Sequence, residues 1–310
     1  MNGLIRSVLF GNYFYGICTI ALSIEASLQQ YSRLNSLSYY LLIFAGTVLY
    51  YTHAYVAEPA SDVVNQRTLW YTRNSLFVTY SQVLLSFIFL LTFILLLKEN
   101  RQHIIHTGLL QWILLGIFPI VAALYYGSVS PQAATNSLRN KGWLKPFVIG
   151  FVWAGAVTVY PVLIGGIEDD IAYTPGIVSI LLFIKNFMFI TILCIMFDIK
   201  DYAADHNHQL KTFVVSYGLR KTIFYLIIPL SIIGLGTFIL YGRLRDFSFL
   251  RILVNTIPFI LLIIVAYSLH RRKSILYYLA IIDGLMLAKA VCGIIGISCN
   301  PVAWVGKWSS

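Results

Sequence analysis

The sequence predicts an all-α, polytopic membrane protein with about nine transmembrane helices in a single bundle. Hydrophobic residues make up 59% of the chain and charged residues only 11%, whereas soluble domains carry about 25% charged residues. The mean hydropathy is +0.79. The length of 310 residues accommodates roughly nine spans of about 20 residues, the length that crosses about 30 Å of hydrocarbon. Little sequence remains for a soluble domain, so residues 1–310 are expected to form one domain.

The first expected helix covers residues 4–27. It contains Asn12, Tyr13, Tyr15 and Glu25, and it lacks the compact apolar stretch and small-residue cleavage site of a removable signal peptide. We therefore interpret it as a membrane helix. The other expected helices are continuous apolar runs that end at short polar segments, and they cover 37–57, 75–97, 108–126, 145–165, 174–197, 220–241, 251–269 and 275–297.

The distribution of basic residues predicts the orientation. With the N-terminus in the cytoplasm, the loops on that side carry about twice as many Lys and Arg residues as the opposite loops. The outer segment 168–170 is purely acidic. We therefore expect a multi-pass protein of the cytoplasmic (inner) membrane with its N-terminus inside and its C-terminus outside. The basic balance suits anionic lipid heads, and no motif indicates nucleic acid.

Three of the chain's 12 acidic residues follow the sixth apolar run. Asp198, Asp201 and Asp205 are spaced i, i+3, i+7, which places them on one face of a helix. Like charges so arranged repel one another unless a cation neutralises them, and Mg²⁺ takes carboxylate oxygens together with substrate phosphates. A solvated helix end is the alternative.

Two segments resemble a known family. The stretch DIKDYAAD at 198–205, followed by Lys211, Thr212 and Gly218, resembles the second aspartate-rich motif of UbiA-type aromatic prenyltransferases, D-x-x-x-D with a further Asp three residues earlier. The segment LRNKGWLKPF at 138–147 is similar to the basic segment before the fifth helix of that family. The resemblance implies a nine-helix intramembrane enzyme with a central, lipid-facing cavity. It also implies Mg²⁺ as cofactor, a polyprenyl diphosphate donor and an aromatic or other lipophilic acceptor in the membrane.

The resemblance also implies roles for individual residues. Asp201 and Asp205 would be catalytic, and the diphosphate would be met by basic residues whose alternative role is orienting the loops. The implied metal ligands are Asp198, Asp201, Asp205, Glu58 and Asp62, and the implied substrate contacts are Arg139, Lys141, Lys145, Arg67 and Lys211.

The first aspartate-rich motif of the family, N-x-x-x-D-x-x-x-D, is altered here. Ala54, Glu58 and Asp62 have its spacing, so the Asn is lost and one Asp is Glu. Pro59 disfavours a continuous helix beyond Glu58, and Gln209 stands where the family usually has Gly. These departures favour a second hypothesis, a membrane protein that binds prenyl lipids without catalysis.

Four charged residues fall within apolar runs: Glu25, Lys185, Asp283 and Lys289. Charges at such depth pair or face a cavity. The i, i+6 spacing of Asp283 and Lys289 is wrong for a pair within one helix, so cross-helix partners are expected. These charges leave a small-molecule transporter as a third hypothesis, although no internal repeat supports it.

Overall fold

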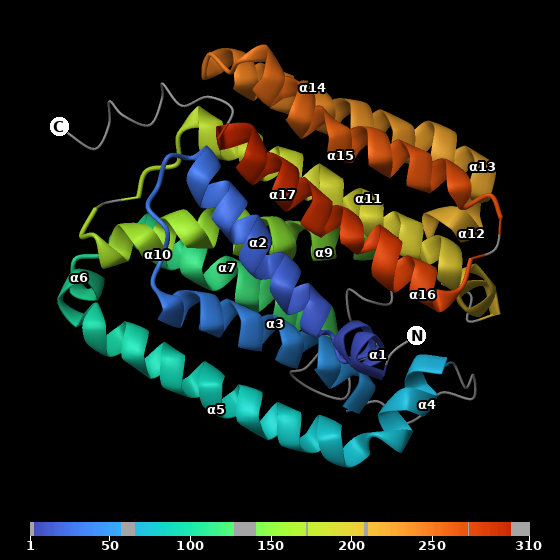
Figure 1. The fold of residues 1–310 in the computed structure, drawn as a ribbon, viewed down its shortest axis with the longest axis horizontal. Coiled ribbons are helices and arrows are strands. Elements are labelled where there is room, and N and C mark those ends of the chain that lie inside the picture. The colour runs from blue at the N-terminus through green and yellow to red at the C-terminus, as the bar shows by residue number, and fades with distance from the viewer. Residues whose placement is uncertain are drawn as a thin grey trace.

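The computed structural model describes residues 3–56, 66–126, 141–171, 173–207, 210–271 and 273–298, which form helices and short connections without a β-strand. Figure 1 shows the long helices side by side in one elongated bundle. The predicted class, an all-α protein with several membrane-spanning helices, is confirmed.

The chain up to residue 126 contributes α1 (Gly3–Phe10), α2 (Tyr13–Gln29), α3 (Leu37–Val56), α4 (Gln66–Arg73), α5 (Ser75–Glu99), α6 (Arg101–Ile105) and α7 (Leu109–Tyr126). The remainder contributes α9 (Lys145–Ala154), α10 (Tyr160–Glu168), α11 (Ile177–Asn207), α12 (Phe213–Tyr217), α13 (Leu219–Thr222), α14 (Ile228–Leu244), α15 (Phe249–Ser268), α16 (Ile275–Tyr277) and α17 (Gly284–Ser298). The π-helical turns η2 (Gly155–Val159), η3 (Ile223–Ile227) and η4 (Tyr278–Ile282) lie within such helical runs.

Each of the nine predicted ranges coincides with one helix or with helices that follow one another. In the described part of the chain, six helical segments are long and apolar enough to cross a membrane, or seven if α1 and α2 form one bent span. Helix α7 is apolar but shorter, and tyrosines and a histidine lower the hydropathy of α3. Nine crossings therefore remain a prediction.

The predicted first helix, 4–27, is wrong as a continuous helix. It breaks into α1 and α2, which meet at an angle of 67°. Asn12 adopts φ 66°, a left-handed conformation that asparagine tolerates better than most residues. A Cβ atom on the neighbouring Gly11 would lie 2.6 Å from the carbonyl oxygen of Ser7, so the sharp bend requires glycine there.

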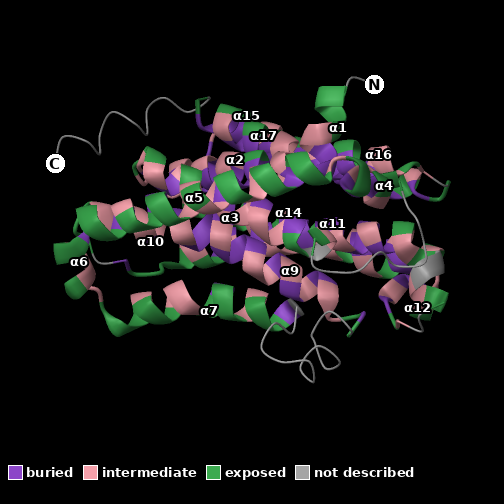
Figure 2. Cartoon of the chain, turned by 90° about the horizontal axis from the view of Figure 1, so that it is seen from below, coloured by how far each residue is buried: buried purple, intermediate pink, exposed green. Residues whose placement is uncertain are grey.

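Helix α11 lies at the centre of the bundle. It packs against α9 on one side and α14 on the other, while α17 packs against α2 and α15. The main hydrophobic core forms around α11 and includes Phe189, Ile192, Ile195 and Met196, all buried. Figure 2 shows buried residues gathered in the middle of the bundle, whereas α6 and α7 carry mainly intermediate and exposed ones.

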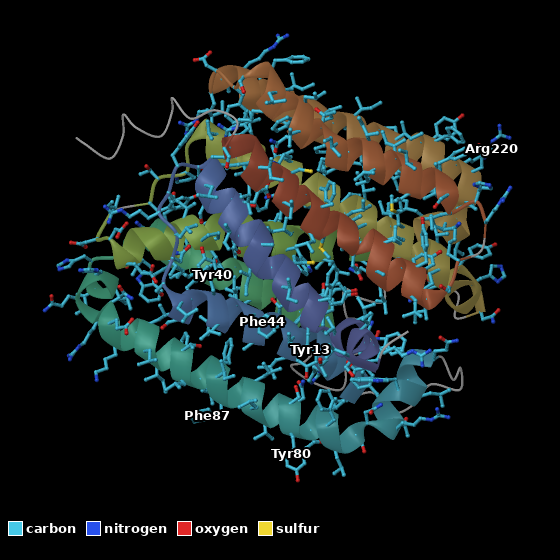
Figure 3. The ribbon with its side chains drawn as sticks, viewed as in Figure 1. Tyr13, Tyr40, Phe44, Tyr80, Phe87 and Arg220 are labelled. Atoms are coloured by element: carbon cyan, nitrogen blue, oxygen red, sulfur yellow. The ribbon has the colours of Figure 1, made fainter. Side chains whose placement is uncertain are left out.

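Helix α5 presents an apolar outer surface. Tyr80 and Phe87 point away from the bundle (Figure 3), with exposed fractions of 74% and 62%. A contiguous apolar helix face exposed in this way is suited to lipid hydrocarbon.

The two ends of the bundle differ in composition. One end gathers α1, α4, α12 and α16 with the C-terminal end of α11 (Figure 1), and an ion pair also joins the start of α9 to it. The opposite end gathers α6, α10 and the connection between α14 and α15. The segments predicted to share one face of the membrane therefore lie together, and the compartment that this end faces stays a prediction.

Candidate active site

The three aspartates lie on the last turns of α11. Asp198 is completely buried, and its Oδ1 accepts a hydrogen bond from Lys145 Nζ at 3.0 Å. Its Oδ2 is also buried and has no hydrogen-bond partner among the described residues. A buried carboxylate oxygen without a partner is costly in free energy, so this atom marks a place where a further positive group or donor fits.

Asp201 and Asp205 follow at one and two turns along α11, as their spacing predicted. Asp201 is 40% exposed and pairs with Lys200 at 3.1 Å, and Asp205 is half-buried. Both carboxylates act electrostatically on Asp198. The three side chains thus offer oxygen donors of the kind that Mg²⁺ prefers. They do not converge on one point, because the described ranges contain no group of three or more His, Cys, Asp or Glu arranged to hold a metal.

The predicted partner acids Glu58 and Asp62 lie outside the described residues, as does Arg139. The other half of a two-motif metal site is therefore not part of this geometry. The fit to Mg²⁺ rests on the buried Asp198 Oδ2 and on the two carboxylates that follow it.

Predicted basic residues gather beside this acidic helix end. Lys145, at the start of α9, has a side chain only 23% exposed and reaches Asp198 directly, whereas Lys141 and Lys211 are exposed. The turn before α9 lies against the segment before α12: a Cβ atom on Gly142 would come within 2.7 Å of the Lys211 backbone. The fold thus brings Lys141, Lys145 and Lys211 to the same end of α11.

Arg67 lies elsewhere and has a clear structural role. It is 5% exposed, donates to the carbonyl oxygen of Phe10 at 3.1 and 3.0 Å, donates also to Asn12 Oδ1, and stacks 4.3 Å over the Tyr55 ring. Tyr71 donates to the same carbonyl at 3.0 Å, and burial raises the pKa of Tyr71. Arg67 therefore fastens α4 to the break between α1 and α2, and its contact with substrate stays a prediction.

An aromatic cavity lies next to the acidic helix end. It has a volume of about 200 Å³ and lies between α2, α3, α7 and the run of α9 and η2. Tyr50, Tyr51, Tyr125 and Trp153 line it together with apolar side chains, and Trp153 Nε1 donates to the Tyr51 hydroxyl. Tyr125 acts electrostatically on Lys145, so the cavity wall adjoins the Lys145–Asp198 pair.

The sequence did not single out these aromatic residues. The chain contains 21 Tyr, 20 Phe and 6 Trp, and most aromatic residues in membrane helices serve packing or interfacial roles. Only Lys145, predicted as a diphosphate contact four residues before the cavity residue Ile149, pointed toward this part of α9.

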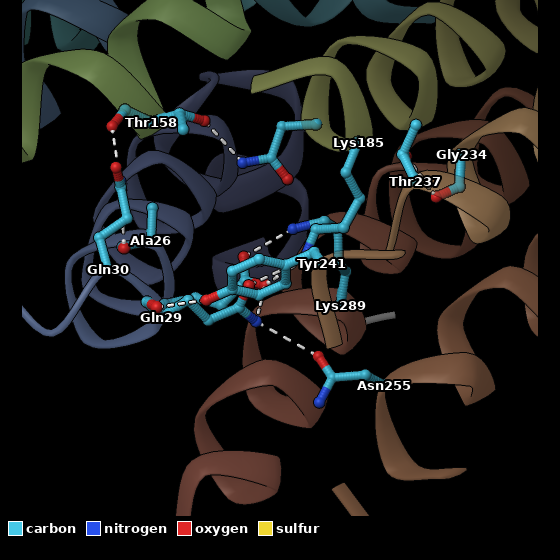
Figure 4. Close-up of polar contacts among 12 residues, drawn as sticks. Ala26, Gln29, Gln30, Thr158, Lys185, Gly234, Thr237, Tyr241, Asn255 and Lys289 are labelled. Carbon is cyan, nitrogen blue, oxygen red and sulfur yellow. Dashed lines mark hydrogen bonds and ion pairs between the residues drawn. The ribbon is translucent and has the colours of Figure 1, made fainter. Parts of the chain in front are cut away.

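The membrane-embedded charges find cross-helix partners, as predicted. Figure 4 shows Lys185 and Lys289 converging with Gln29 around the buried Glu25. Glu25 accepts from Lys185 Nζ at 3.2 Å and from Lys289 Nζ at 2.6 Å. Asp283 is not the partner of Lys289; it lies within electrostatic reach of Tyr15 and Arg67.

The close contact at Gly142 gives a test of the site's construction. Replacing Gly142 with alanine would place a Cβ atom within 2.9 Å of three backbone atoms of Lys211 and Thr212. We expect a loss of about 1–3 kcal/mol in the free energy of unfolding, because backbone cannot move aside as a side chain can, together with weaker substrate binding.

Gly236 supplies the matched control, since a Cβ atom there meets nothing within 4 Å on α14. Gly236→Ala should be neutral or stabilising by about 0.5–1 kcal/mol. Thermal unfolding in detergent measures both variants, and equal stability of the two would show that the turn at Gly142 is not tightly fitted.

Comparison with known proteins provides one structural match. A solved structure of a digeranylgeranylglyceryl phosphate synthase in membranes aligns over 96% of this chain and 99% of its own, with 14% sequence identity and a TM-score of 0.54. The two proteins share a fold. No protein-family model matches the sequence, and no curated protein matches it significantly. At 14% identity the likeness concerns the arrangement of helices, and it covers the whole described bundle.

Proposed function

We propose that this protein transfers a prenyl group from a polyprenyl diphosphate to an aromatic or other lipophilic acceptor within the membrane, in a Mg²⁺-dependent reaction. The observation that carries the proposal is the junction of the buried Lys145–Asp198 pair with an aromatic cavity. The shared fold with a prenyl-lipid synthase and the resemblance of the aspartate motif to UbiA-type prenyltransferases support it independently. Residues 1–310 would form this unit as one domain.

The reaction breaks the C–O bond between the allylic carbon and the diphosphate, and the electron pair leaves with the diphosphate. The acceptor's electron pair then forms the new bond to the allylic carbon, and the acceptor releases a proton. Lys145 would stabilise the charge that grows on the leaving oxygen. The rings of Tyr50, Tyr51 and Trp153 would face the allylic cation, and the apolar walls would exclude water.

The acidic residues would hold the cofactor. Asp198, Asp201 and Asp205 would ligate Mg²⁺, with Glu58 and Asp62 as further ligands, and bound Mg²⁺ would supply positive charge for the departing diphosphate. Arg139, Lys141 and Lys211 would add contacts to the diphosphate, and we retain Arg67 as a further candidate. The site would face the cytoplasm, with the N-terminus on the same side.

Diphosphate release tests the proposal directly. Purified protein is incubated with Mg²⁺, a lipophilic acceptor mixture and a series of prenyl diphosphates, with a parallel sample in EDTA. We expect release that depends on both Mg²⁺ and donor. Tight donor binding without release would instead support the non-catalytic prenyl-lipid binder, which the altered first motif at Ala54, Glu58 and Asp62 favours.

The cavity predicts a chain-length effect. Ala156 lines the cavity, so Ala156→Phe should fill part of the space proposed for the isoprenoid tail. We expect turnover of geranylgeranyl diphosphate to fall by about tenfold or more, the range that steric mismatch in an apolar pocket produces. Turnover of the much shorter dimethylallyl diphosphate should change less.

Ala123→Phe is the matched control, because Ala123 is exposed on α7 beside the cavity residue Ala122. It adds the same ring on the outer surface and should leave both donors unaffected. Equal effects of Ala156→Phe on the two donors would remove the tail from this cavity.

A further inference from the structure

The connection between α14 and α15 carries two arginines with unused hydrogen-bond donors. Arg251 is 1% exposed, and its Nε and Nη2 have no hydrogen-bond partner among the residues that the structure describes. Arg245, half-buried, has an unpartnered Nε under the same condition. A guanidinium with five donors is rarely buried without an acceptor, because each buried donor left unpaired costs free energy.

The two guanidinium groups share aromatic surroundings. Arg251 Nη1 donates to the Tyr31 hydroxyl at 3.3 Å, and its guanidinium lies 3.4 Å from the centre of the Phe247 ring. Arg245 lies 5.0 Å from the centre of the Tyr31 ring. Tyr31 is thus flanked by both arginines, which fixes them close together while several of their N–H groups remain available.

The charge around Arg251 is unbalanced. Arg251 acts electrostatically on Lys185, which shares the single carboxylate of Glu25 with Lys289. Within the described chain, neither Arg245 nor Arg251 has an ion pair with a carboxylate. A buried region with this surplus of positive charge favours an anionic occupant.

The surroundings indicate which anion fits. Leu244, Phe249 and Leu250 beside the arginines expose 51%, 81% and 51% of their surface. They belong to the ends of α14 and α15, both apolar enough to span a membrane. The arginines therefore lie where apolar helix surface meets the polar end of the bundle, the depth at which lipid phosphates are found.

From these observations we propose that Arg245, Arg251 and Tyr31 form a binding site for the phosphate of an anionic membrane phospholipid. The planar fork of arginine matches phosphate oxygens bidentately, and the acyl chains would lie along the exposed apolar faces of α14 and α15. This site is at the opposite end of the bundle from Asp198, so the proposal stands apart from prenyl transfer.

Native mass spectrometry tests the site on the full-length protein. Wild type is released from mixed micelles that contain phosphatidylglycerol or phosphatidylcholine, and binding of the first lipid is measured. We expect phosphatidylglycerol to be retained in preference. Arg245→Gln and Arg251→Lys should each weaken its binding by about tenfold, the effect expected for losing a charge-assisted hydrogen bond.

Arg243→Gln is the matched control. Arg243 is exposed and lies two residues from Arg245 on the same turn, so this variant makes the same change of net charge and should bind lipid as wild type does. Equal losses in Arg243→Gln and Arg245→Gln, or equal retention of both lipids by wild type, would overturn the site. Displacement of the lipid by millimolar inorganic phosphate would overturn the lipid assignment in favour of a soluble anion.

Discussion

Replacing Asp201 with asparagine is expected to lower Mg²⁺-dependent diphosphate release by a factor of about 10²–10³, the loss typical when one group that stabilises transition-state charge is removed. The change removes a charged oxygen donor proposed to hold Mg²⁺ against the diphosphate. The rate is measured at saturating donor, with donor affinity measured separately, so that a lost metal ligand appears in turnover as well as in binding.

Asp201 is better suited to this test than Asp198. Its side chain is 40% exposed and its pair with Lys200 is at the surface, and such pairs contribute at most about 1 kcal/mol to stability. Asp201→Asn should therefore fold normally. Asp198 is fully buried against Lys145, so changing Asp198 would combine loss of function with loss of stability.

Asp170→Asn is the control for charge. Asp170 is exposed in the connection before α11, at the other end of that helix, and its left-handed backbone conformation accepts asparagine. This variant should retain wild-type turnover. If Asp201→Asn keeps wild-type activity as well, the α11 carboxylates are not the site of the reaction.

Replacing Glu25 with glutamine is expected to give the largest loss of stability, about 3–5 kcal/mol, the cost of leaving a buried charge without its partner. Glu25 is completely buried and is the common partner of Lys185 and Lys289. Glutamine keeps the shape and removes the charge, so two buried ammonium groups would face only neutral acceptors. Thermal unfolding in detergent, monitored as a shift of the midpoint, measures the effect.

Two further variants make this prediction specific. Glu99→Gln removes a carboxylate that is exposed at the end of α5 and should shift the midpoint little. Adding Lys289→Met to Glu25→Gln removes one of the uncompensated cations and should recover part of the loss, since apolar replacement of a buried charge pair is often neutral. A midpoint for Glu25→Gln equal to that of wild type would mean that water or another anion compensates the lysines.

The positions of the helices could be predicted because the chain consists of apolar runs that end at charged segments. A membrane requires every backbone polar group in its interior to be satisfied within a helix, so each such run maps onto a helix. The break between α1 and α2 was missed because it depends on the local geometry of Gly11 and Asn12. Hydropathy alone does not report a bend within an apolar stretch.

The acidic part of the site could be predicted, and its surroundings could not. The spacing of Asp198, Asp201 and Asp205 placed them on one helix, and α11 indeed continues to Asn207. The sequence treated Lys145 as a diphosphate contact, whereas the structure shows it paired with Asp198 across two helices. Such pairings depend on how α9 packs against α11, and that is a tertiary property.

The buried charges show the same division. Their presence within apolar runs predicted cross-helix partners, and Glu25 meets Lys185 and Lys289. The identity of the partners follows from a close approach of α2 and α17, where Gly293 leaves room for the Glu25 side chain. No pattern in one helix reveals which residue of another helix will face it.

A structure determined with Mg²⁺ and a non-transferable polyprenyl thiodiphosphate tests the central claim most directly. The account predicts that the metal and diphosphate lie against Asp198, Asp201 and Asp205 beside Lys145, with the isoprenoid tail in the cavity lined by Tyr50, Tyr51, Tyr125 and Trp153. Diphosphate bound elsewhere in the bundle, or α11 carboxylates directed away from an occupied cavity, would contradict it.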